Sequence, residues 1–202
     1  MNANVTAVPG HRHSEASEIH EQRELGFWLY LMSDAILFAL LFMTYGIMVG
    51  NTAGGPTGKQ LFSLNNAALE TALLLISSTT FGFASLSSRQ GNRSAVLGWL
   101  AITFLLGAGF VFLEIREFLG MIRAGAGPDR SGFLSGFFTL VGTHGTHVSV
   151  GLIWILILSA QVAIKGLRLS VTSRLFRLGL FWHFLDIAWV GIFSVVYLPG
   201  LL

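Results

Sequence analysis

Five long apolar runs divide the chain, and short polar segments separate them. A helix rises about 1.5 Å per residue, so roughly 20 apolar residues cross a hydrocarbon core of about 30 Å. The pattern therefore predicts an all-α integral membrane protein, built as a bundle of five transmembrane helices. We predict these spans at about residues 25–49, 65–87, 94–119, 133–164 and 175–198.

A polar tail precedes the first apolar run. Residues 1–24 include His11, His13 and His20 among several glutamates. Histidines in a polar tail are typical of a flexible segment or a surface helix, and we do not expect them to bind a metal. We predict two parts: a polar cytoplasmic tail, residues 1–24, and a five-helix transmembrane domain, residues 25–202.

The basic residues between the spans predict how the chain is oriented. Five crossings place the two termini on opposite sides of the membrane. The side of the N-terminal tail carries eight basic residues, Arg12, Arg23, Arg89, Arg93, Lys165, Arg168, Arg174 and Arg177. The other side carries four, Lys59, Arg116, Arg123 and Arg130. Because Lys and Arg gather in cytoplasmic loops, we predict a cytoplasmic N-terminus and an outside C-terminus.

The composition agrees with a membrane protein and excludes several kinds of chemistry. Hydrophobic residues make up 53% of the 202 residues and charged residues 11%, whereas a soluble domain has about 25% charged residues. The chain has no cysteine, which excludes disulfides, thiolate catalysis and cysteine-ligated zinc or iron–sulfur clusters. The formal net charge is +2, and the basic residues lie in short loops, so we expect no nucleic-acid partner.

Polar side chains interrupt the apolar runs, and they are the candidate functional residues. A charge at the membrane centre costs about 2.5–3.5 kcal/mol, so each such group needs a partner or water. His183 and Asp186 are three residues apart, which puts both on one face of a helix. The candidates are Asp34, Glu70, Glu114, His144, His147, His183 and Asp186.

The depth of each group, counted from the helical rise, predicts two polar clusters. The inner cluster comprises Asp34, His147, His183 and Asp186. The outer cluster comprises Glu70, Glu114 and Arg116.

Three interpretations of these buried polar groups stay open. In the first, they form hydrogen bonds between helices and fix the packing, and each contact stabilises the bundle by about 0.6 kcal/mol. In the second, they form a proton relay. In the third, His144, His147 and His183 bind a metal or haem. The apolar middle of the second and third spans speaks against a continuous relay. The small residues around His144 and His147 are typical of close helix packing and speak against a metal site.

Four segments resemble subunit III of the haem–copper terminal oxidases. GFFTLVGTHGTHVSVGLIW (136–154) and LFWHFLDIAWVGIFSVVYL (180–198) resemble that family's two strongest signatures. LYLMSDAILFALLF (29–42) resembles its segment with a membrane-buried carboxylate, with Asp34 where the family often has glutamate. LLGAGFVFLEIREF (105–118) resembles a fourth segment, with Glu114 at its acidic position. The resemblance covers about residues 25–202.

Two loops point to one branch of this family. TAGGPTGK (52–59) and GPDRSGFLSGFF (127–138) look most like subunit III of cytochrome o ubiquinol oxidase. Longer members have seven spans, and five are seen in bacterial oxidases. Because some bacterial cytochrome c oxidases also have a five-span subunit III, that branch remains an alternative.

The resemblance implies a non-catalytic subunit of a complex that passes electrons from quinol to oxygen and pumps protons. It implies no catalytic residue, cofactor or metal in this chain, since the family's haems and copper reside in subunit I. The implied partners are subunit I, subunit II, a small subunit IV and phospholipids, in the bacterial inner membrane. The candidate residues would then serve packing or be linked to protons.

An alternative of a different class is a small transporter or proton channel that acts alone. The buried carboxylates Asp34, Glu70, Glu114 and Asp186 motivate it.

Overall fold

The structure, a computed structural model, describes residues 9–201, and it describes side-chain surroundings for residue 22 and residues 24–200. It divides into two units, residues 1–37 and residues 38–202, which are described separately. The predicted polar tail lies partly outside the described residues. Helix α1 (Pro9–Met48) already begins within it, and the side chains of His11, His13 and His20 are not described.

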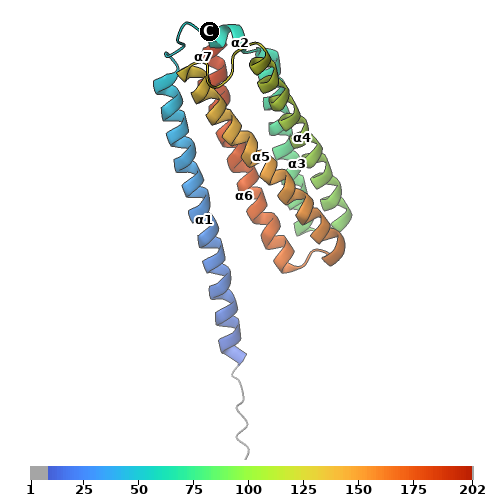
Figure 1. Cartoon of the computed structure of the whole chain (residues 1–202). Coiled ribbons are helices and arrows are strands. Elements are labelled where there is room, and N and C mark those ends of the chain that lie inside the picture. Colours follow the sequence, from blue (N-terminus) through green and yellow to red (C-terminus); the bar gives the residue numbers. More distant parts are fainter. Residues whose placement is uncertain (1–8, 202) are drawn as a thin grey trace, which may run out of the picture. The chain divides into compact units, whose positions relative to one another are not determined.

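Five long helices account for almost all of the described residues (Figure 1). The elements after α1 are α2 (Gly58–Leu61), α3 (Leu64–Arg89), α4 (Arg93–Arg123), α5 (Gly132–Lys165), α6 (Leu169–Ile192), the π-helix η1 (Phe193–Tyr197) and α7 (Leu198–Leu201). The spans long and apolar enough to cross a membrane are Glu24–Met48, Leu64–Arg89, Arg93–Arg123, Gly132–Lys165 and Leu169–Gly200. Between residues 9 and 201 the structure has no β-strand. The predicted class, an all-α membrane protein with five spans, is confirmed.

Helix ends follow local signals in the sequence. The Asn92 side chain accepts a hydrogen bond from the Ala95 backbone N–H at 3.1 Å and caps α4. The Ser131 hydroxyl accepts one from Leu134 at 3.2 Å and caps α5. Side chains of these types satisfy backbone donors that the first helical turn leaves free. Gly166 follows α5 with φ +70°, a left-handed conformation that glycine adopts without strain. The chain can therefore reverse sharply between consecutive spans.

Helices α3 to α6 form a ring of four within residues 38–202. Helix α3 packs on α4, α4 on α5, α5 on α6, and α6 back on α3. Figure 1 draws these four helices in teal, green, orange and red, respectively. Short connections make consecutive helices antiparallel neighbours, the arrangement of an up-and-down bundle. The ring therefore has an interior into which polar side chains can turn away from lipid.

Trp182 of α6 holds the centre of this ring. Its side chain is 1% exposed, and its Nε1–H donates to Ser77 Oγ of α3 at 3.1 Å. A Cβ atom added to Gly107 of α4 would lie 2.9 Å from the indole, and one added to Gly151 of α5 would also lie 2.9 Å from it. The two glycines thus form a slot for Trp182, which contacts all three other helices of the ring.

A second indole repeats the contact between α6 and α3. Trp189 Nε1–H donates to Thr71 Oγ1 at 3.1 Å. Each accepting hydroxyl in turn donates to a carbonyl of α3, Thr71 to Ala67 and Ser77 to Leu74, both at 2.7 Å. The two helices are therefore joined by hydrogen bonds in which every donor is satisfied, as buried polar groups require.

The loop end of the bundle is closed by aromatic rings and two glycines. Phe62 packs against Tyr197 and Phe137, with ring centroids 4.9 and 5.0 Å apart. A Cβ added to Gly58 of α2 would lie 3.0 Å from the Cα of Gly200 in α7. The absence of both side chains lets the loop after α1 sit directly on the last turn of the chain.

Candidate functional site

His144 lies fully buried in the ring. Its Nε2 is 3.1 Å from the carbonyl oxygen of Leu185. Since a carbonyl oxygen accepts only, Nε2 carries the proton and donates. The imidazole packs against Trp189, with centroids 5.1 Å apart, and edge-on to Phe110 at 5.6 Å. Its second ring nitrogen, Nδ1, is buried and has no hydrogen-bond partner.

His147, one turn further along α5, is half-buried. Its Nδ1 donates to the Thr143 carbonyl oxygen at 2.8 Å, and its ring lies 5.4 Å from that of Phe38. The two histidines of the THGTH segment therefore bond to different backbone carbonyls.

His183 and Asp186 share one side of α6, as their spacing predicts. His183 Nδ1 lies 2.6 Å from Ser78 Oγ of α3 and 3.9 Å from Asp186 Oδ2. Asp186 is buried, and neither of its oxygens has a hydrogen-bond partner, whereas the His183 side chain is 48% exposed. The imidazole thus bridges α6 and α3 at the edge of the ring and leaves part of its surface outside.

Asp34 is buried, with an exposed fraction of 7%. It belongs to the unit of residues 1–37, whereas His147, His183 and Asp186 belong to the other unit. Within residues 38–202, the structure brings together His183 and Asp186 of the predicted inner cluster.

The predicted outer cluster is described more fully, and it has an additional member. Glu70 of α3 and Glu114 of α4 are 1% and 4% exposed and close enough for their charges to interact, both with each other and with Glu117. Arg116 is exposed and does not pair with them. Tyr197 of η1 donates its hydroxyl to Glu117 Oε2 at 3.2 Å.

The sequence offered a signal for Glu117, since it stands three residues after Glu114 and so lies on the same side of a helix. Glu114 itself presses directly on the backbone of α5. A Cβ at Gly145 would lie 2.6 Å from its carboxyl carbon. Gly145 therefore makes the room that the Glu114 carboxyl occupies.

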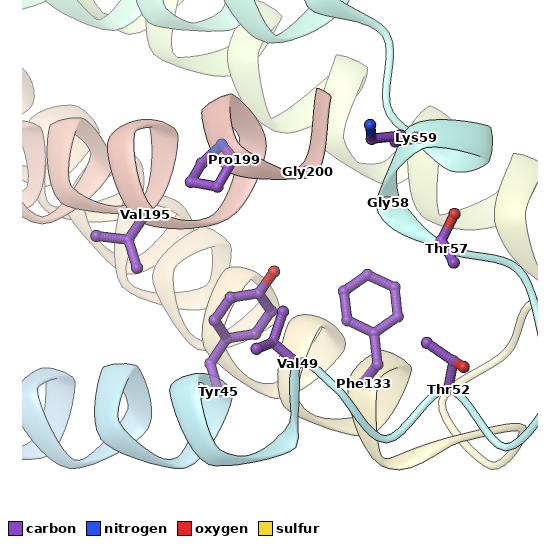
Figure 2. A pocket seen from close by; sticks show the side chains of 10 residues that line it. All are labelled: Tyr45, Val49, Thr52, Thr57, Gly58, Lys59, Phe133, Val195, Pro199 and Gly200. Carbon is purple, nitrogen blue, oxygen red and sulfur yellow. The ribbon is translucent and has the colours of Figure 1, made fainter. Parts of the chain in front are cut away.

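A cavity of about 290 Å³ lies at the loop end of the bundle (Figure 2). Tyr45, 2% exposed, turns its hydroxyl into the cavity, and Lys59 stands at the rim beside Gly200 (Figure 2). The remaining lining is largely apolar and includes Phe133 and Val195. A hydroxyl and an ammonium group beside apolar walls suit a ligand with a hydrogen-bond acceptor and an apolar body.

Among residues with described surroundings, no three His, Cys, Asp or Glu side chains converge closely enough to hold a metal ion. The candidate residues contribute hydrogen bonds between helices, buried carboxyl groups and apolar contacts.

Comparison with known proteins identifies the family. The family model described as cytochrome c oxidase subunit III matches residues 6–201. The chain belongs to the cytochrome c oxidase subunit III family. The family expected from the four sequence segments is thereby confirmed.

Relatives in this family carry the names of two kinds of oxidase. The chain is 52% identical over 193 residues to cytochrome bo(3) ubiquinol oxidase subunit 3 of Pseudomonas aeruginosa, covering 96% of this chain and 92% of the relative. It is 45% identical over 185 residues to quinol oxidase subunit 3 of Bacillus subtilis, covering 92% and 91%. It is also 45% identical over 177 residues to cytochrome c oxidase subunit 3 of Bacillus sp. (strain PS3), covering 88% and 86%.

Proposed function

We propose that this chain is the non-catalytic subunit III of a respiratory quinol oxidase, and that it stabilises the catalytic subunit. Membership of the subunit III family and the 52% identity to a ubiquinol oxidase subunit 3 support the quinol branch. The haems and copper belong to subunit I in this proposal, with subunit II and a small subunit IV as further partners.

The observation that carries the supporting role is the distribution of polar and apolar surface. Glu70, Glu114 and His144 are buried within the bundle, whereas only 28% of the most apolar window of α4 and 33% of that of α5 is buried. Many large apolar side chains of these helices therefore remain exposed, available to lipid or another subunit. Such a surface suits docking within the membrane, where van der Waals packing drives helix association.

The proposed orientation places the N-terminal tail in the cytoplasm of a bacterial inner membrane. The α3–α4 turn and the α5–α6 turn carry basic residues at the same end of the bundle. There the guanidinium of Arg93 donates to the Ala163 carbonyl of α5, and Arg174 donates to Gln161 at 2.8 Å. Basic residues at that end agree with the cytoplasmic face.

A test of the supporting role compares the oxidase with and without this chain. We expect the chain to co-purify in mild detergent with a large haem-bearing membrane protein. Without it, the haem spectra should stay normal, while the oxidase should lose activity faster during turnover. An oxidase that keeps its full activity and lifetime without this chain would contradict the proposal.

Phospholipid binding is the second part of the proposed function, and the cavity in Figure 2 supports it. The cavity lies where α1 ends and α5 begins, at the level of lipid headgroups. Its volume of about 290 Å³ is near the lower end of ligand pockets, so it would take a headgroup and leave the acyl chains outside.

Native mass spectrometry of the purified complex tests this binding. We expect retained anionic phospholipid that is reduced in Lys59→Gln and in Tyr45→Phe. Lys165→Gln, which removes an exposed lysine at the other end of α5, is the matched control and should leave retention unchanged. Equal lipid retention in all three variants would exclude the cavity as the site.

A further inference from the structure

Two buried carboxyl groups and one half-buried carboxyl group lie together near the start of α3 and the end of α4, and none of them forms an ion pair with another described residue. Glu70 and Glu114 are buried, and Glu117 is half-buried. Both carboxyl oxygens of Glu70 and Oε2 of Glu114 are inaccessible to solvent and have no hydrogen-bond partner. Among the described side chains, no Lys, Arg or His nitrogen lies within 4.0 Å of these three carboxyl groups. Three negative charges cannot remain side by side in such surroundings, because each loses its hydration and repels the others.

A cavity connects this cluster to the surface. It has a volume of about 240 Å³, which holds several water molecules at about 30 Å³ each. Glu70 and Glu117 line it, and its exposed lining residues are Asn66, Arg116 and Gly120. Asn66 is near the start of α3 and Gly120 near the end of α4, so the mouth lies close to the membrane surface. Water can therefore reach Glu117 from the aqueous side.

A break in helix geometry supplies the fourth member of the cluster. Residues Phe193–Tyr197 form a π-helix between α6 and α7, and its last residue, Tyr197, is fully buried with its hydroxyl on Glu117. A π-helix is rare and is frequently found at functional sites. The turn thus places a hydrogen-bond donor against the carboxyl group that faces the cavity.

We propose that Glu70, Glu114, Glu117 and Tyr197 form a proton-binding site that exchanges protons with the aqueous phase through this cavity. In the exchange, an O–H bond of a hydronium ion in the cavity breaks, an O–H bond forms on a Glu117 carboxylate oxygen, and a water molecule is left. Glu117 is the member that water reaches, and Glu70 and Glu114 share the bound protons behind it. This inference does not depend on the proposed function of the chain.

The groups that face the cluster from each neighbouring helix support this assignment. Helix α3 contributes Glu70, and η1 contributes Tyr197. Helix α4 contributes Glu114 and Glu117, together with Arg116 at the rim. Helix α5 faces Glu114 with residues that do not titrate, Gly142, Gly145, Thr146 and Ser149. The bound protons are therefore shared among the carboxyl groups of α3 and α4.

Infrared spectroscopy of the full chain in lipid tests the proposal. We expect a C=O stretch of protonated carboxyl groups that shifts when the water is replaced by D₂O and loses intensity in Glu70→Gln and Glu117→Gln. Tyr197→Phe keeps the ring and removes the donor, so it should change the position of this band while thermal unfolding stays close to that of the wild type. Asp129→Asn, in an exposed loop, is the control and should leave the band unchanged.

Three outcomes would overturn the proposal: carboxylate bands alone, a C=O band that does not shift in D₂O, or a C=O band that Na⁺ converts to carboxylate. The last outcome would assign a cation site instead. Because Glu70→Gln could fail to fold, a second measurement uses the wild-type chain with ¹³C-labelled glutamate side chains. There, carboxyl resonances of the protonated form at neutral pH, which exchange with added acid, support the proposal, and their absence overturns it.

Discussion

Replacing Gly107 with alanine tests how tightly Trp182 is held in the bundle. A Cβ atom at position 107 would lie 2.9 Å from Trp182 Cη2 and 2.9 Å from Leu152 Cδ2, whereas ordinary contact begins at 3.4 Å. The indole would have to move by about 0.5 Å, as the difference between these distances requires. Its hydrogen bond to Ser77 and its complete burial oppose that movement.

The expected loss follows from the cost of overpacking. Forcing one extra methyl group into a packed interior costs about 1–3 kcal/mol. At about 2–4 °C per kcal/mol for a chain of this size, the melting temperature of Gly107→Ala should fall by roughly 2–12 °C. The measurement is the monodisperse fraction of a fluorescently tagged full chain in mild detergent, followed by size-exclusion chromatography after heating.

Gly98 provides a matched control on the same helix, because no atom lies within 4 Å of its added Cβ. Gly98→Ala should melt at or above the wild-type temperature, since alanine favours a helix by up to about 1 kcal/mol. Adding Trp182→Phe to Gly107→Ala should cost less than the sum of the two single changes, because the smaller ring relieves the clash. If Gly107→Ala and Gly98→Ala have the same melting temperature, Trp182 is not tightly packed against Gly107.

Three further changes probe other contacts. Gly145→Ala should lower folded yield, because its Cβ would lie 2.6 Å from the Glu114 carboxyl carbon; adding Glu114→Ala should restore yield measured by the same chromatography. Trp189→Phe removes the hydrogen bond between the two helices and should cost about 0.5–1.5 kcal/mol. Thr71→Val removes this bond together with the bond from Thr71 to the Ala67 carbonyl, so it should cost at least as much, and the double variant should melt close to Thr71→Val. Gly58→Ala should expose the C-terminal turn to carboxypeptidase, because its Cβ would lie 3.0 Å from the Gly200 Cα, and unchanged proteolysis would argue against that contact.

The class of the fold could be predicted because the bilayer imposes one requirement on each span. Any segment that crosses must supply roughly 20 apolar residues and satisfy its own backbone bonds. Local chemistry also predicted the side-by-side placement of His183 and Asp186, since three residues make almost one helical turn.

Contacts between helices were harder to predict. The partner of Glu117 is Tyr197, which is 80 residues away in the chain and is presented by a π-helix. The periodicity of the sequence does not predict where a helix changes to a π-helix. Similarly, Ser78 is ordinary in a membrane span, and its role appears only when α3 lies beside His183.

The pairing of α6 with α3 has a consequence for biogenesis. The ring is complete only after α6 has been inserted. During synthesis, α3, α4 and α5 are therefore in the bilayer before their partner α6 is present. They can remain there because the Thr71 and Ser77 hydroxyls already bond to carbonyls of their own helix. Each hydroxyl oxygen can still accept a second hydrogen bond. Trp182 and Trp189 of α6 then donate to these oxygens, and the bonds within α3 stay in place.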